Sequence, residues 1–203
     1  MLPIDQLIFW LFFPACIGLL TQVIWGVELT NRLVASGTFI FCIEQARMAV
    51  KDLRQIKTAK AYIQDVRLNT FYQVTIITIA LELLGFYISI FCLGWGSILI
   101  LLSQIWFNLL ASIKIEFIYK VGNCNLYSTP VMALSAPIIY IQVWKISERI
   151  PVLTADILGL ILISFWMLQI GSLLISWLLF TMVIAYGIVK VLFSSYVLGH
   201  QHQ

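Results

Sequence analysis

The chain has 203 residues, of which 62% are hydrophobic and only 10% are charged, and its formal net charge is +3. Ordinary soluble domains carry roughly 25% charged residues, and a fold of this size could not hide so many apolar side chains from water. The composition therefore excludes an ordinary water-soluble domain, and it gives no reason to expect a nucleic-acid partner. We predict a single all-α polytopic membrane domain over residues 1–203, with the lipid bilayer as its surroundings.

Five segments are long and apolar enough to cross the hydrocarbon core, which takes about 20 residues. Close turns around Gly94 and at Gly171-Ser172 divide four of them into two pairs. Two further segments are less clear: 33–43 is short, and 126–144 is interrupted by Pro130 and Pro137. We therefore predict about five transmembrane helices and keep six as the alternative. The five lie at approximately 7–27, 70–93, 95–118, 152–168 and 173–193.

Residues 44–67 form the one long stretch that looks water-soluble. Apolar residues recur there at steps of three and four, which is typical of an amphipathic helix. The other side of that helix is basic, and each Lys or Arg near an anionic membrane contributes ~1 kcal/mol to its attraction. We expect a cytoplasmic helix that binds anionic lipid headgroups or a membrane partner protein; a solvated connector is the alternative. Its basic residues are Arg47, Lys51, Arg54, Lys57 and Lys60.

The placement of basic residues predicts the orientation in the membrane. Lys and Arg concentrate in cytoplasmic loops. With five spans and the N-terminus outside, all twelve basic residues lie on the cytoplasmic side, together with the C-terminus. This arrangement leaves 126–144 as a re-entrant or interfacial segment, since a sixth span would move Lys145 and Arg149 outside.

Glu82 is the most unusual residue, because it lies deep within an apolar span with no basic residue near it in the sequence. An ionisable group at the centre of a bilayer costs at least ~2.5–3.5 kcal/mol, which makes it a candidate functional residue. Thr78 lies one turn away on the same helical face. If the turn between the spans centres on Trp95, Asn108 lies level with Glu82, with Gln104 one turn away. We expect a neutral Glu82 that donates a hydrogen bond to one of them, either as a link between helices or as a proton- or cation-binding group.

No sequence motif identifies a reaction. The chain has no phosphate-binding Gly-rich loop, no H-E-x-x-H and no G-x-S-x-G. Its four cysteines include no C-x-x-C pair, and its two histidines, His200 and His202, lie in the C-terminal tail. We therefore expect no cofactor, no metal ion and no catalytic set of residues.

Three classes of function remain open. A non-catalytic accessory, assembly or scaffold component of a membrane complex ranks first, because it needs no catalytic residues and can use the basic helix for docking. A small proton- or cation-coupled transporter or channel using Glu82 is the alternative. A lipid-modifying enzyme ranks last, with its chemistry at the cytoplasmic rim, where Glu116, Glu148 or Asp156 would act with Lys114, Lys145 or Arg149.

Overall fold

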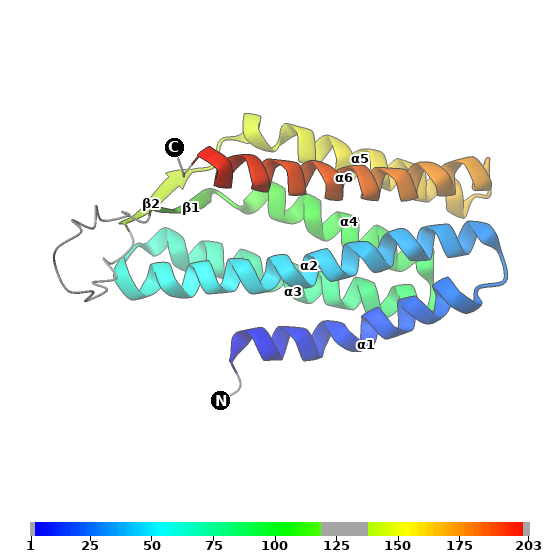
Figure 1. Cartoon of the computed structure of the whole chain (residues 1–203), viewed down its shortest axis with the longest axis horizontal. Helices are drawn as coiled ribbons and strands as arrows, with labels where there is room; N and C mark the ends of the chain where they lie inside the picture. Colours follow the sequence, from blue (N-terminus) through cyan, green and yellow to red (C-terminus); the bar gives the residue numbers. More distant parts are fainter. Residues whose placement is uncertain (1–2, 119–137, 201–203) are drawn as a thin grey trace.

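The computed structural model describes residues 3–118 and 138–200, which form long helices packed side by side and one short β-hairpin (Figure 1). Each helix runs antiparallel to the one before it, and the hairpin lies between the fourth and fifth helices. In chain order the elements are α1 (Ile4–Trp25), α2 (Leu29–Tyr62), α3 (Val66–Phe91), α4 (Leu93–Leu110), β1 (Ile113–Ile118), β2 (Ile138–Val143), α5 (Ile146–Met167) and α6 (Ser172–His200).

The two ends of the bundle differ. One, which we call the hairpin end, carries the β-hairpin, the α2–α3 connection and both ends of the chain (Figure 1). The other, the short-turn end, carries the three tight connections at 26–28, 92 and 168–171. All six described helices are long and apolar enough to cross a membrane, and many large apolar side chains on them are exposed. These features indicate a membrane location.

Helix α2 differs from the prediction of a separate helix over 44–67. It is one helix of 34 residues, about 51 Å long, that joins the apolar segment 33–43 to the basic stretch. No Gly or Pro interrupts the junction, and the buried face continues across it from Cys42 through Ala49 to Leu53. The helix ends at Tyr62, before the predicted position 67.

Helix α3 begins at Val66, earlier than the predicted position 70. Asp65 caps its N-terminus by accepting a 2.8 Å hydrogen bond from the backbone N–H of Arg67. The Arg67 guanidinium also binds this carboxylate and holds the pKa of Asp65 below its usual range. The cap is therefore anionic at neutral pH, as favoured at a helix N-terminus.

The predicted third span, 95–118, is wrong at both ends. Helix α4 begins at Leu93, because only Cys92 separates it from α3, and it ends at Leu110. The remaining residues enter β1, where Ile113 and Ile115 are buried and Lys114 between them is exposed. This alternation of buried and exposed side chains is typical of a strand rather than a helix.

The proline-broken segment 126–144 lies mostly outside the described residues, which resume at 138. Its described part is strand β2 and not a re-entrant helix. It pairs antiparallel with β1, from Ile113 opposite Val143 to Ile118 opposite Ile138.

The α5–α6 pair is broken at residues 168–171, so of the predicted break at Gly171-Ser172 only Gly171 belongs to the turn and Ser172 begins α6. Gln169 and Gly171 both take left-handed backbone conformations, with φ of 58° and 59°, which reverses the chain. Helix α5 begins at Ile146, six residues before the predicted 152, so residues expected near its start lie well inside it.

Candidate functional site

Five polar side chains on three helices form a connected group, which we call the polar chain. Four of them are buried, with exposed fractions of 3% for Glu82, 4% for Asn108, 5% for Arg149 and 8% for Asp156. The fifth, Gln104, is partly buried. A polar group among apolar helices is costly unless it is hydrogen-bonded, so the partners of each residue indicate what the group can do.

Glu82 on α3 binds Gln104 on α4. The Gln104 Nε2 atom donates to Glu82 Oε1, so the carboxyl accepts the bond and the expected donor role of Glu82 is not seen. The contact follows from the turn at Cys92, which sets Ser89 opposite Gly96 and Gly85 opposite Ile100. Because this turn comes three residues earlier than Trp95, Gln104 and not Asn108 is the residue facing Glu82.

Asn108 connects the same helix to α5. Its Nδ2 atom donates to the Gln104 carbonyl at 3.0 Å and to Asp156 Oδ2 at 3.2 Å. Thr78, also predicted to belong to this group, is buried but donates at 2.9 Å to Val74 O within its own helix. The structure thus extends the polar chain to α5 and leaves the Thr78 hydroxyl out of it.

Asp156 is a second buried carboxyl that sequence reasoning placed near the edge of the membrane. Because α5 begins at Ile146, Asp156 lies ten residues, about 15 Å, along the helix. It lies seven positions after Arg149, so both residues project from one face of the helix. In the sequence, this seven-residue spacing could have indicated that Arg149 and Asp156 share a helical face. It does so only once α5 is known to begin before Arg149.

Arg149 connects three parts of the backbone at the hairpin end. Its Nη1 atom donates to the carbonyls of Asn108 at 2.5 Å and Ala111 at 2.6 Å, and its Nη2 atom donates to Trp144 O at 2.8 Å. The first two carbonyls belong to the C-terminus of α4, where orphan acceptors and the helix dipole favour a cation. The Nε atom is buried without a hydrogen-bond partner among the described residues.

The polar chain runs along the bundle axis. Glu82 lies ten residues, about 15 Å, from the short-turn end, and Arg149 lies nineteen residues, about 28 Å, from it. The polar chain therefore leads from mid-depth of the bundle to the hairpin end.

A cavity of about 420 Å³ lies beside the polar chain, between α2, α4, α5 and α6. Its wall is mostly apolar, and it includes the side chains of Gln104 and Asp156. Gln104 therefore contacts Glu82 and also borders the cavity. The volume is in the range of small-molecule sites in proteins, about 300–1,000 Å³.

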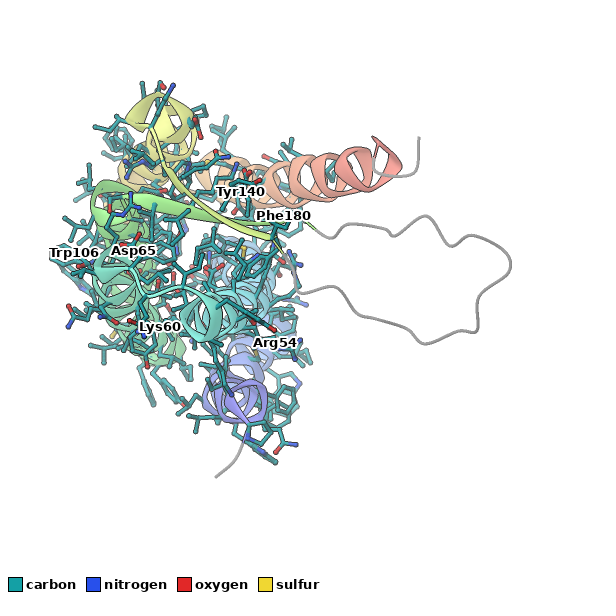
Figure 2. All side chains as sticks on the ribbon, turned by 90° about the vertical axis from the view of Figure 1, so that its left-hand side faces the viewer. Arg54, Lys60, Asp65, Trp106, Tyr140 and Phe180 are labelled. Atoms are coloured by element: carbon teal, nitrogen blue, oxygen red, sulfur yellow. The ribbon has the colours of Figure 1, made fainter. Side chains whose placement is uncertain are left out.

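The basic residues of α2 form an exposed stripe along its second half. The opposite face of the helix is buried, and it is formed by Ala49, Leu53, Ile56 and Ala59. Arg47 pairs with Glu44 at 2.8 Å, and Figure 2 shows Arg54 and Lys60 at the hairpin end. The stripe comprises Arg47, Lys51, Arg54, Lys57 and Lys60.

Two of the residues considered for a lipid-modifying enzyme, Arg149 and Asp156, are buried in the polar chain, whereas the others are not part of it. Lys114 pairs with Glu116 at 2.8 Å on β1, and Glu148 is exposed in the first turn of α5. Within residues 3–118 and 138–200, no group of three or more His, Cys, Asp or Glu side chains is placed to hold a metal ion.

No family model, curated protein or solved structure matches this chain.

Proposed function

We propose that the protein is a small proton-coupled membrane transporter in which Glu82 binds the transported proton. The observation that supports this most directly is the position of Gln104, which binds the buried Glu82 carboxyl and also forms part of the cavity wall. Protonation of Glu82 can thereby change the wall of a space large enough for a solute. This was the alternative class from the sequence, and the geometry favours it.

The burial of two carboxyls supports transport over a purely structural link between helices. Glu82 and Gln104 would suffice to join α3 to α4, and such bonds average well under 2 kcal/mol in membranes. Asp156 adds a second costly group at similar depth, and Asn108 connects it to the α4 backbone beside Gln104. Intramembrane carboxyls that border a cavity are typical of ion and proton pathways.

In this proposal all six helices span the membrane, with the hairpin end in the cytoplasm. Basic residues gather at that end, including Lys57, Lys60, Lys114 and Lys145, whereas Arg32 lies near a short turn. Positive charge marks the cytoplasmic side. Since both chain ends lie at the hairpin end, both termini are cytoplasmic, in place of the external N-terminus predicted with five spans.

Proton flux in vesicles tests the proposal. The purified chain is reconstituted with a pH-sensitive dye inside, and an imposed pH gradient is followed over time. The wild type is expected to dissipate the gradient faster than empty vesicles, and Glu82→Gln is expected to return the rate to that of empty vesicles. Glu148→Gln, which changes an exposed carboxyl on α5, serves as the control and is expected to match the wild type. An unchanged rate in Glu82→Gln would contradict the proposal.

The exposed basic stripe on α2 supports an accessory or scaffold role as the second candidate. In that role the stripe binds a partner protein or anionic lipid headgroups at the cytoplasmic surface. Changing Lys51, Arg54, Lys57 and Lys60 to Gln is expected to remove co-purifying partners while proton flux stays as it was. Partners that remain bound would argue against docking through this stripe.

A further inference from the structure

We propose that the cavity between α2, α4, α5 and α6 binds a lipophilic organic cation, such as an amine or quaternary ammonium with a large apolar body, through the carboxylate of Asp156. This inference names the substrate class of the same site and so rests on the proposed transport function. Neither the basic stripe nor the hairpin takes part in it.

The cavity wall selects for an apolar body. It is formed mainly by aliphatic and aromatic side chains from four helices, with Gln104 and Asp156 among its few polar groups. Small-molecule sites combine such an apolar wall with a few placed polar groups that orient the ligand. A strongly hydrated solute would lose its water there with little compensation.

The charge of the wall selects for a cation. Among the described residues the lining contains the carboxyl of Asp156 and no Lys or Arg. Arg149, the nearest basic residue along α5, is directed to three backbone carbonyls instead. An anion would therefore have no positive partner in the cavity, whereas a cation would have Asp156.

Asp156 has room for such a partner. Its Oδ2 atom accepts one hydrogen bond from Asn108, a neutral amide, and no hydrogen bond to its other oxygen is recorded from the described part of the chain. A buried carboxylate is stabilised by a paired cation. The rings of Phe41, Phe180 and Tyr186 also line the cavity, and aromatic faces attract desolvated organic cations.

Two probes of the same shape and opposite charge test the charge preference. Binding of tetraphenylphosphonium and of tetraphenylborate to the full chain in detergent is measured by equilibrium dialysis. The wild type is expected to bind the phosphonium saturably and the borate at least tenfold more weakly. Asp156→Asn is expected to lose at least tenfold in phosphonium affinity, and the Glu148→Gln control is expected to keep it. Equal binding of both probes, or unchanged binding in Asp156→Asn, would overturn the inference.

A second measurement uses only the wild type, so it does not depend on the variant folding. Dicyclohexylcarbodiimide modifies buried carboxyls, and mass spectrometry locates the modified peptide. Tetraphenylphosphonium is expected to protect Asp156 from this reagent, and tetraphenylborate is not. Modification of Asp156 that the phosphonium leaves unchanged would count against binding at this residue.

The two proposals can fail separately. Glu82-dependent proton flux without phosphonium binding would overturn the substrate class and leave the transport function standing. Phosphonium binding with no Glu82-dependent flux would keep the binding site and overturn the transport function.

Discussion

Arg149 brings a full positive charge to a buried position where its recorded partners are backbone carbonyls. It joins the end of α4 and Trp144, two residues before α5, to the first turn of α5. The guanidinium suits this task because its planar array of N–H groups can reach several acceptors at once. It also stacks on Trp144, with its central carbon 5.3 Å from the ring centroid. Arg149 thus acts in the structure as a clamp at the hairpin end.

Replacing Arg149 with Met tests this role. The change leaves buried carbonyl oxygens unpaired, each at a cost of about 1–3 kcal/mol, so the free energy of unfolding is expected to fall by at least that amount. The measurement is unfolding of the purified chain in mixed detergent and sodium dodecyl sulfate. Lys145→Met changes an exposed cation at the start of the same helix and is expected to have little effect. Equal stability of the two variants would refute the clamp.

The residues of the polar chain also show how much of the site could be predicted from the sequence. Glu82 was identifiable because a carboxyl in an apolar span stands out. Its partner Gln104 was one of the two residues named, but Asn108 was placed level with Glu82 in error, since that placement depended on where a tight turn falls. Arg149 was considered only for the rim of an enzyme. Its place in the polar chain could not be predicted, because its partners are backbone carbonyls, two of them at the end of another helix, and nothing local in the sequence records them.

At the scale of elements, α3 and α4 cross in close contact at Gly96. A Cβ atom added there would collide with Ser89 Oγ and lie 2.5 Å from Gly85 O. Backbone approach of this kind is typical of helix pairs in membranes, where small residues let helices pack tightly. The same crossing fixes which residues of α4 face Glu82, so the polar chain depends on it.

The variant Gly96→Ala tests the importance of the crossing. The methyl group must push α3 and α4 apart, and overpacking of this kind typically costs about 1–3 kcal/mol. We expect a lower midpoint in thermal unfolding and a loss of proton flux as Gln104 moves from Glu82. Gly187→Ala on α6 is the matched control, because an added Cβ there has no neighbour within 4 Å. A Gly96→Ala protein as stable and active as the control would exclude the tight crossing.

The ends of the helices and strands show a second limit of prediction from the sequence. Long apolar runs predicted four helices, α1, α3, α5 and α6, whose ends differ by several residues. The α2 helix was divided in two, because its hydropathy changes at residue 44 while its buried face continues through Ala49 and Leu53. Residues 113–118 were assigned to a span, because a short apolar run fits a helix end as well as a strand. Burial against neighbouring helices decided both cases.

At the scale of the whole molecule, the six helices of the described residues follow one another antiparallel and bring both termini to the hairpin end (Figure 1). The polar chain extends toward this end, where its last residue, Arg149, is buried, and basic residues cluster at the same end. The short-turn end offers only brief connections. In the proposed orientation, the molecule presents its charged surface to the cytoplasm and short turns to the outside.

Labelling from outside the cell tests this orientation. Single cysteines are introduced at Val27, Ile63 and Gln169 into a chain from which the native cysteines have been removed. A membrane-impermeant maleimide is expected to label positions 27 and 169 in intact cells, and to label 63 only after the membrane is opened. Labelling of position 63 from outside would reverse the orientation, and labelling of 27 and 169 from opposite sides would contradict six spans.

The central claim is that proton movement at Glu82 is coupled to passage of a solute through the bundle. A buried site holds an organic cation best when its carboxyls are charged, so cation entry and proton departure are linked. The most direct test is uptake of tetraphenylphosphonium into vesicles that are acidic inside, with the membrane potential clamped and empty vesicles as the blank. The account predicts uptake that stops when the pH gradient is collapsed and that is absent in Glu82→Gln. Uptake by the wild type that is the same with and without the gradient would contradict it.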